Sequence, residues 1–191
     1  MEVDNLFVVC ADGGAALARL WGWQPSVIVG DQDSLDPETQ AYWQRQNIPV
    51  QQFPTAKDQT DLDLAVEHAL KAGATSLTLV GAWGNRIDHS LGNVELLYRL
   101  ALKGIPNELL TKEHRLSAFC GEFRGRVRVG CFVSLLALSP VVQKVTTSGL
   151  LYPLQRATLK KGSTRTISNV ATVTDFSVEI GEGVLLVVIE Q

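Results

Sequence analysis

The pattern of apolar residues changes once along the chain, near residue 112, and this change restricts how the 191 residues can fold. Before that point, short apolar runs alternate with amphipathic segments, which is the pattern of a parallel sheet covered by helices. Beyond it, short β-rich segments are separated by turn residues, which is the pattern of an antiparallel sandwich. We therefore expect an α/β domain with a mostly parallel sheet over residues 1–113, followed by an all-β, jelly-roll-like sandwich over residues 114–191.

The expected elements can be given by residue. In the first region, we expect strands at Leu6–Cys10, Ser26–Gly30, Ile48–Phe53, Ser76–Val80 and Glu108–Thr111. The helices expected between them are Gly13–Leu20, Pro37–Gln46, Asp61–Ala72 and Ser90–Lys103. In the second region, we expect strands at Leu116–Cys120, Arg126–Val129, Cys131–Leu138, Val141–Thr146, Leu150–Leu154, Ala157–Leu159, Val170–Thr174, Phe176–Ile180 and Val184–Ile189.

Charged residues are distributed unequally between the two regions. Residues 31–63 hold seven acidic and two basic residues, whereas residues 111–168 hold ten lysines or arginines and two acidic residues. These opposite signs favour two modules. The formal net charge of the whole chain is only -3, which argues against a general nucleic-acid binder or a polybasic membrane binder.

The cysteines and the first residues indicate the compartment. The three cysteines lie far apart without CxxC spacing, so we expect neither a zinc site nor a redox dithiol. The acidic start, Met1–Asp4, differs from a signal peptide, and the longest apolar runs are too short to span a bilayer. We therefore expect a cytoplasmic protein that binds no membrane and no nucleic acid.

Two aspartates directly follow the apolar strand expected at Ser26–Gly30. Asp31 and Asp33 are two positions apart, so in an extended segment their carboxylates point to the same side. Two such carboxylates repel each other unless a cation lies between them. Mg²⁺ suits this arrangement, because it usually binds one or two carboxylates and leaves its other positions to water and phosphate. The alternative is ordinary turn chemistry, since Asp and Ser are common in turns.

A second polar segment, Lys57–Asp61, precedes an expected helix. Thr60 or Asp61 could simply cap that helix, because acids near a helix N-terminus interact well with its dipole. Asp58 lies outside the helix, so capping does not explain it. Lys57 could contact a phosphate or pair with a neighbouring acid.

A third polar segment, Gly81–His89, lies between an expected strand and an expected helix. Its glycines and the following helix N-terminus suit phosphate, and Arg86 offers two parallel hydrogen bonds to an anion. Asp88 and His89 are compatible with either caps or ligands. Ligands bind at the carboxyl ends of strands in α/β sheets, so we expect the three segments at one sheet edge, where they suit a Mg²⁺–polyphosphate site.

Several common enzyme signatures are missing from the sequence. It contains no GxxxxGK[ST] phosphate loop and no GxSxG, and the segment Asp12–Ala15 after the first strand is not GxGxxG. P-loop kinases, dinucleotide-dependent dehydrogenases and serine hydrolases are therefore not supported.

Six stretches resemble the thiamine pyrophosphokinase family and occur in its order. They are ADGGA (Ala11–Ala15), PSVIVGDQDS (Pro25–Ser34), KDQTD (Lys57–Asp61), GNRIDHSLGN (Gly84–Asn93), TTSGLLYPL (Thr146–Leu154) and SN (Ser168–Asn169). The resemblance implies an α/β domain, a C-terminal β-sandwich and a homodimer with active sites between subunits. It also implies the transfer of pyrophosphate from ATP to the hydroxyethyl group of thiamine, which gives thiamine diphosphate and AMP.

The same resemblance implies roles for individual residues. Catalytic roles fall to Asp31, Asp33, Asp58 and Asp61, and the Mg²⁺ ligands among them are Asp31, Asp33 and Asp58. ATP contacts fall to Asp12, Lys57, Gly84, Arg86, Asp88 and His89. Thiamine contacts fall to Tyr152, Ser168 and Asn169, although Tyr152 taken alone would be read as a core aromatic.

Three other interpretations stay open at this point. The acidic segments suit equally a pyrophosphokinase for another hydroxyalkyl heterocycle, such as a pterin. A non-catalytic nucleotide-binding sensor would keep the same pocket. This interpretation is disfavoured because the sequence retains every carboxylate of the acidic segments. A purely structural sandwich module explains the second region but leaves the clustered acids unexplained.

We predict that Asp31→Asn abolishes turnover, because it removes the charge that the proposed cation needs, and leaves the melting temperature nearly unchanged. Thiamine-dependent AMP release and a thermal melt of the same sample check both outcomes. Collapse of the fold would favour the structural interpretation of this aspartate.

Overall fold

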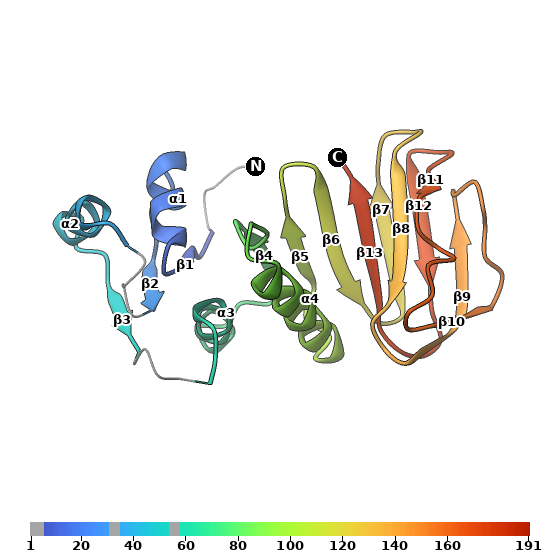
Figure 1. Cartoon of the computed structure of the whole chain (residues 1–191), viewed down its shortest axis with the longest axis horizontal. Helices are drawn as coiled ribbons and strands as arrows, with labels where there is room; N and C mark the ends of the chain where they lie inside the picture. The colour runs from blue at the N-terminus through green and yellow to red at the C-terminus, as the bar shows by residue number, and fades with distance from the viewer. Residues whose placement is uncertain (1–5, 31–34, 54–57) are drawn as a thin grey trace. The chain divides into compact units, whose positions relative to one another are not determined.

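The structure is a computed structural model that describes residues 6–30, 35–53 and 58–191. The chain forms two compact units, Met1–Thr75 and Ser76–Gln191 (Figure 1). Within the described ranges, no helix has both the length and the apolar composition that crossing a membrane requires.

The first unit is a parallel sheet with helices. Its strands are, in sheet order, β1 (Val9–Ala11), β2 (Val27–Gly30) and β3 (Val50–Gln52). Its helices are α1 (Gly14–Trp21), α2 (Pro37–Arg45) and α3 (Asp61–Lys71). The alternation of strands and helices predicted for this region is confirmed.

Alternate residues of β2 enter two different hydrophobic clusters. Ile28 packs with residues of α1 and with Trp43 of α2, whereas Val27 and Val29 pack with Leu64 of α3. Because successive side chains of a strand point to opposite faces, helices cover both sides of β2. This burial explains the uninterrupted β-branched run of the strand.

Side-chain caps determine where α2 and α3 begin. Asp36 accepts a hydrogen bond from the backbone N–H of Thr39 at 2.9 Å, and Pro37 is the first residue of α2. Thr60 accepts one from the backbone N–H of Asp63 at 3.2 Å. The capping alternative is therefore confirmed for Thr60, and Asp61 is not the residue that caps α3.

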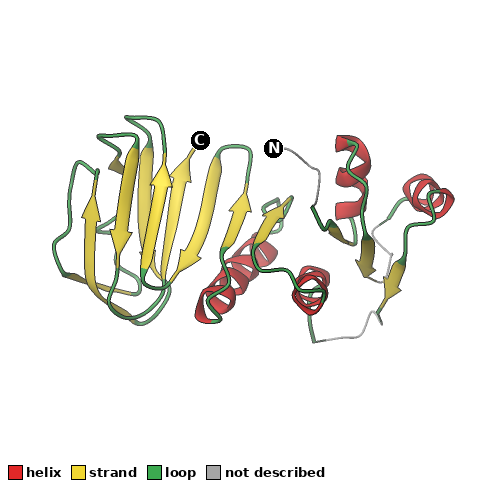
Figure 2. Ribbon diagram, turned by 180° about the vertical axis from the view of Figure 1, so that it is seen from behind, coloured by secondary structure: helices red, strands yellow, loops and turns green. Residues whose placement is uncertain are grey.

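The second unit starts with a βαβ segment and continues as an antiparallel sandwich (Figure 2). The segment consists of β4 (Leu77–Val80), α4 (Ile87–Leu102) and β5 (Asn107–Leu110). The other strands are β6 (His114–Phe119), β7 (Glu122–Arg126), β8 (Phe132–Ala137), β9 (Val141–Ser148), β10 (Ala157–Lys160), β11 (Asn169–Val170), β12 (Asp175–Glu179) and β13 (Leu185–Glu190). They form a six-stranded sheet, β11-β8-β13-β6-β5-β4, and a four-stranded sheet, β10-β9-β12-β7.

The two sheets of the sandwich share one hydrophobic core. Val133 and Val187 come from the six-stranded sheet, and Val145 and Val178 from the four-stranded sheet, and all four side chains are fully buried. The α/β region followed by an antiparallel sandwich agrees with the fold class predicted from the sequence.

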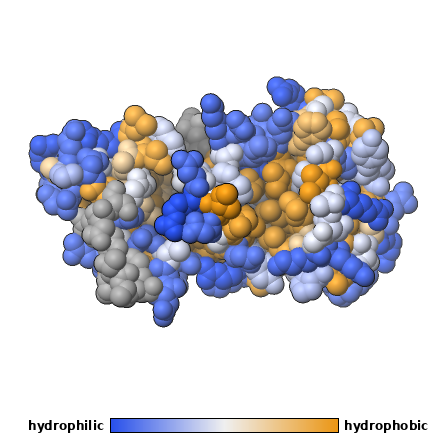
Figure 3. All heavy atoms as spheres, in the orientation of Figure 1, coloured by the Kyte–Doolittle hydropathy of each residue, from blue (hydrophilic) through white to orange (hydrophobic). Residues whose placement is uncertain are grey.

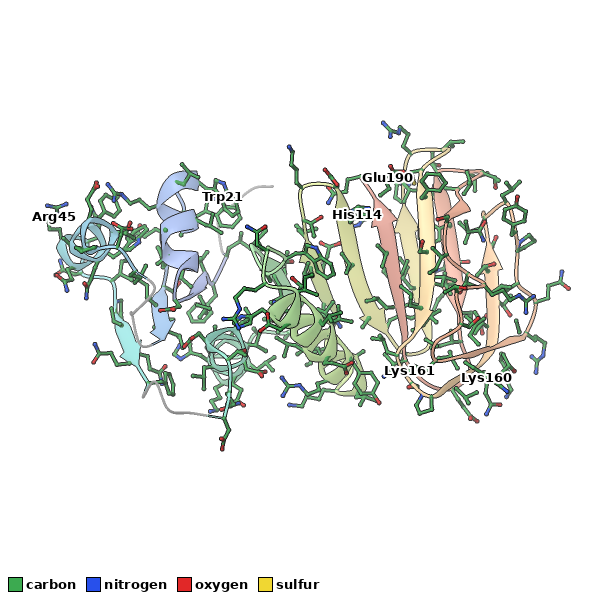
Figure 4. The ribbon with its side chains drawn as sticks, viewed as in Figure 1. Trp21, Arg45, His114, Lys160, Lys161 and Glu190 are labelled. Carbon is green, nitrogen blue, oxygen red and sulfur yellow. The ribbon has the colours of Figure 1, made fainter. Side chains whose placement is uncertain are left out.

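Strand β5 connects the parallel and antiparallel parts of the six-stranded sheet. It pairs in parallel with β4 and antiparallel with β6. The sheet then continues through β13, where Glu190 pairs with His114 (Figure 4). The first two polar segments follow β2 and β3 of one sheet, whereas the third follows β4 of another sheet. The expectation that all three follow strands of one sheet is therefore wrong. The predicted module boundary at residues 113 and 114 stays a prediction.

Three expected strands differ from the structure. β7 ends at Arg126, so Arg126–Val129 is not a strand, and β11 ends at Val170. The segment Leu150–Leu154 is irregular, apart from an isolated bridge between Leu150 and Ala171. It contains Pro153, which cannot donate a ladder hydrogen bond.

We predict that Gly125→Ala lowers the free energy of unfolding by about 2 kcal/mol, as overpacked cores commonly do. A β-carbon at this position would lie 2.7 Å from Phe176 Cζ and 3.1 Å from Phe123 Cε1, inside the sandwich. Urea unfolding checks the result. The control is Gly92→Ala in α4, where a β-carbon meets nothing within 4 Å, so stability should rise. Equal stability of both variants would contradict the packing argument.

Candidate active site

Two carboxylates from different elements converge on Gly30. Asp12 directly follows β1, Gly30 ends β2, and Asp61 is the first residue of α3. A β-carbon on Gly30 would lie 3.0 Å from Asp12 Oδ1 and 3.2 Å from Asp61 Oδ1. The missing side chain at Gly30 therefore leaves room for both carboxylates at the carboxyl edge of the sheet, where α/β proteins bind ligands.

The backbone of Asp12 holds its side chain in this place. Its N–H donates to the carbonyl of Val29 at 2.9 Å, and its carbonyl accepts from the N–H of Ala15 at 3.0 Å. The residue has a φ of 43°, a left-handed conformation that is uncommon for a residue other than glycine. A strained backbone of this kind is found disproportionately at functional sites.

One oxygen of Asp12 is buried without a partner. Within the part of the chain that the structure describes, Oδ1 is a buried side-chain oxygen with no hydrogen bond. Buried polar atoms are nearly always hydrogen-bonded, so an exception of this kind calls for an additional donor or a cation. Carboxylate oxygens are the ligands that Mg²⁺ prefers, and Asp12 and Asp61 therefore fit that ion.

Several predicted metal and phosphate residues fall outside the described ranges. Asp31, Asp33 and Lys57 lie outside the described residues. Asp58 is exposed in the bend before α3. Among residues 6–30, 35–53 and 58–191, no three His, Cys, Asp or Glu side chains form a group that could hold a metal. The predicted ligand set Asp31, Asp33 and Asp58 stays a prediction.

The third polar segment forms the N-terminal end of α4 in the second unit. Arg86 Nη2 lies 2.6 Å from Asp88 Oδ2, and Arg86 Nε donates to Asp88 Oδ1 at 3.3 Å. These bonds hold the pKa of Asp88 below its ordinary value. Arg86 itself is the N-cap residue, and its side chain makes no capping hydrogen bond. The carboxylate of Asp88 accepts a hydrogen bond from the N–H of His89, so the first turn of α4 offers an anion its partial positive charge and its other N–H groups.

Sequence reasoning missed two residues that shape this segment. Ser90 is buried, and its Oγ accepts a hydrogen bond from the N–H of Gly84 at 3.2 Å. Asn93 donates from Nδ2 to the carbonyl of Ala82 at 2.6 Å. Both lie in the stretch GNRIDHSLGN. Their places on one face of α4, the face next to the preceding loop, could have indicated that they hold this loop. His89 is exposed.

The predicted thiamine residues lie around the irregular segment Leu150–Leu154. Tyr152 is 67% exposed, so its interpretation as a core aromatic is wrong. Ser168 is exposed, has a φ of 59°, and donates its N–H to Ser134 Oγ at 2.9 Å. Asn169 is buried and hydrogen-bonds the backbone of Tyr152. The structure thus brings Tyr152 and Asn169 together.

Two family models match the chain. The model of "Thiamin pyrophosphokinase, catalytic domain" matches residues 3–108, and that of "Thiamin pyrophosphokinase, vitamin B1 binding domain" matches residues 123–185. A relative, the thiamine pyrophosphokinase of Bacillus subtilis, is 29% identical over 187 residues, which cover 97% of this chain and 87% of the relative.

Solved structures of such proteins are similar over both units. The crystal structure of the Bacillus subtilis thiamine pyrophosphokinase matches with a TM-score of 0.89 and 28% identity, and covers 97% of this chain and 87% of that chain. That of the Geobacillus thermodenitrificans thiamin pyrophosphokinase matches with a TM-score of 0.88 and 29% identity, and covers 100% of this chain and 88% of that chain. Since the catalytic-domain match alone spans more than half of the sequence, the chain belongs to the thiamine pyrophosphokinase family.

Proposed function

We propose that the protein is an ATP:thiamine diphosphotransferase, which transfers pyrophosphate from ATP to thiamine and releases AMP. The observation that carries this proposal is the convergence of Asp12 and Asp61 on Gly30, with a buried carboxylate oxygen that lacks a partner. The family matches supply the substrate class, because both a catalytic and a vitamin B1 binding domain are recognised.

The reaction replaces one phosphorus–oxygen bond by another. The hydroxyethyl oxygen of thiamine attacks the β-phosphorus of ATP, and the bond from that phosphorus to the oxygen bridging to the α-phosphorus breaks. AMP leaves with the bridging oxygen. The hydroxyl proton passes to a carboxylate, for which we propose Asp61. Positioning of the two substrates then supplies much of the rate.

Two groups of residues would bind the two substrates. We propose that Arg86 and the first turn of α4 bind phosphate oxygens, supported by the loop that Ser90 fixes. We propose that Tyr152 and Ser168 contact thiamine, which their exposure permits.

Mg²⁺ is the cofactor that the carboxylates favour. We propose Asp31, Asp33 and Asp58 as its ligands, with Asp12 beside them. When bound, the ion neutralises part of the triphosphate charge. The donor set consists of hard oxygens, as this ion requires.

We also propose a homodimer in the cytoplasm. Apolar side chains gather over α4 and the neighbouring strands on the face shown in Figure 3. A surface of this kind suits contact with a second copy of the chain.

Mixing the protein with ATP, Mg²⁺ and thiamine should give AMP and thiamine diphosphate in equal amounts, because the pyrophosphoryl group moves as one unit. Chromatography of the nucleotides and of thiamine checks this result, and chelation of the metal should stop it. ADP in place of AMP would indicate phosphoryl transfer. Turnover of a hydroxymethyl pterin without turnover of thiamine would favour the other pyrophosphokinase, and ATP binding without turnover would favour a sensor.

We predict that Asp12→Asn reduces turnover at least about a hundredfold while it raises the melting temperature of the ligand-free protein. The substitution neutralises a buried oxygen without a partner, which should stabilise by about 1 kcal/mol, or about 2–4 °C. Activity and a thermal melt, both on the same preparation, provide the measurement.

The matched control for this substitution is Asp36→Asn. Asp36 caps α2, and its hydrogen bonds with Thr39 hold its pKa below the ordinary value. The variant weakens a charged cap, so the melting temperature should fall slightly and activity should persist. A lower melting temperature for Asp12→Asn would show that Asp12 stabilises the fold, which contradicts its proposed role.

A further inference from the structure

Asn169 is a buried side chain whose amide is almost fully hydrogen-bonded within the chain. It is 7% exposed. Its Oδ1 accepts from the N–H of Tyr152 at 3.0 Å and from the N–H of Val170 at 2.9 Å, and its Nδ2 donates to the carbonyl of Tyr152 at 2.8 Å. An asparagine oxygen has two acceptor sites, and both are therefore occupied.

The two hydrogen bonds from Asn169 to Tyr152 take the place of the backbone hydrogen bonds that a neighbouring strand would make. A peptide group in a sheet offers one N–H and one C=O, and the amide of Asn169 meets both with the complementary atoms. The neighbouring N–H of Leu151 donates to the carbonyl of Val170 at 2.9 Å. At the end of the irregular segment, the N–H of Leu154 donates to Thr147 Oγ1 at 2.8 Å. This segment is thus held in a definite position although it is not a strand.

The side chains next to this clamp differ in exposure. The Tyr152 side chain is exposed and projects from the clamped backbone. Ser168 precedes Asn169 and is exposed, and its backbone N–H donates to Ser134 Oγ. Tyr152 and Ser168 can therefore meet a ligand directly, whereas the acceptor sites of Asn169 are already occupied.

We propose that Asn169 is a positioning residue for thiamine binding, which acts by holding the backbone of Tyr152 and does not itself contact thiamine. This inference rests on the proposed function. It replaces the contact role that the resemblance implied for Asn169 and keeps that role for Tyr152 and Ser168.

Asn107 provides a matched control elsewhere in the same unit. It is 6% exposed, its Nδ2 donates to the carbonyls of Ala118 and Ile105, each at 2.9 Å, and its Oδ1 accepts from the N–H of Ala118 at 3.0 Å. Asn107→Ala therefore removes a clamp of the same chemistry and burial between β5 and β6. It should lower the melting temperature as Asn169→Ala does and leave the KM for thiamine within about twofold of the original value.

A double-mutant cycle tests the proposal. KM and kcat are measured for thiamine at saturating ATP, and for ATP at saturating thiamine, with the original protein, Asn169→Ala, Tyr152→Ala and the double variant. Asn169→Ala should raise the KM for thiamine about tenfold, because the one or two hydrogen bonds that hold the Tyr152 backbone in its binding position are lost, and leave the KM for ATP nearly unchanged. Tyr152→Ala should have a similar effect, and the double variant should resemble Tyr152→Ala alone.

The outcomes separate the two proposals. Single effects that multiply to about a hundredfold in the double variant would show that Asn169 binds thiamine independently of Tyr152 and would overturn the inference. An unchanged KM in Asn169→Ala would overturn it as well. If that variant does not fold, Asn169→Asp gives the same test, because it keeps the acceptor but turns an oxygen towards the carbonyl of Tyr152. If the original protein shows no thiamine-dependent AMP release, that result would instead reject the proposed function.

Discussion

The space beside Gly30, which two carboxylates border, is the constraint around which the first unit is built. Asp12 and Asp61 lie against Gly30, and a side chain at that position would meet both carboxylates. Asp12 Oδ1 is buried without a hydrogen bond among the described residues, which is costly because a buried oxygen loses its hydration. The remainder of the unit offsets this cost through the burial of β2 between two hydrophobic clusters. The fold thus holds in place an arrangement that these side chains would not adopt by themselves.

Local signals account for the part of the structure that the sequence predicted well. The β-branched run of β2, the proline at the start of α2 and the Thr60 cap of α3 each depend on neighbouring residues alone. The order of strands and helices follows from the same periodicities. The C-terminal ends of the helices agree to within one residue because caps and glycines act over a single turn, whereas α4 begins at Ile87 and not at the expected Ser90.

Long-range pairing accounts for what the sequence did not show. The apolar run of β4 does not show whether the strand pairs with the strands before it or with β5, since its composition suits both arrangements. Similarly, the segment Leu150–Leu154 has the composition of a strand apart from Pro153, and its hydrogen bonds go to the side chains of Asn169 and Thr147. The hydrogen bonds of the Asn169 amide to Tyr152 are a tertiary property, which a motif match does not reveal. The places of Asp12 and Asp61 in the fold could be predicted, because Asp12 follows a strand and Asp61 begins a helix that local signals identify.

The pairing of β5 with both β4 and β6 has an evolutionary consequence. A recombination break in the short connection between β5 and β6 would leave an unpaired strand edge on each fragment, and such edges promote aggregation. The catalytic and vitamin-binding regions of this chain therefore cannot be exchanged as independent cassettes by a crossover at that connection. A break before β4, where the compact units meet along the chain, would leave the six-stranded sheet whole.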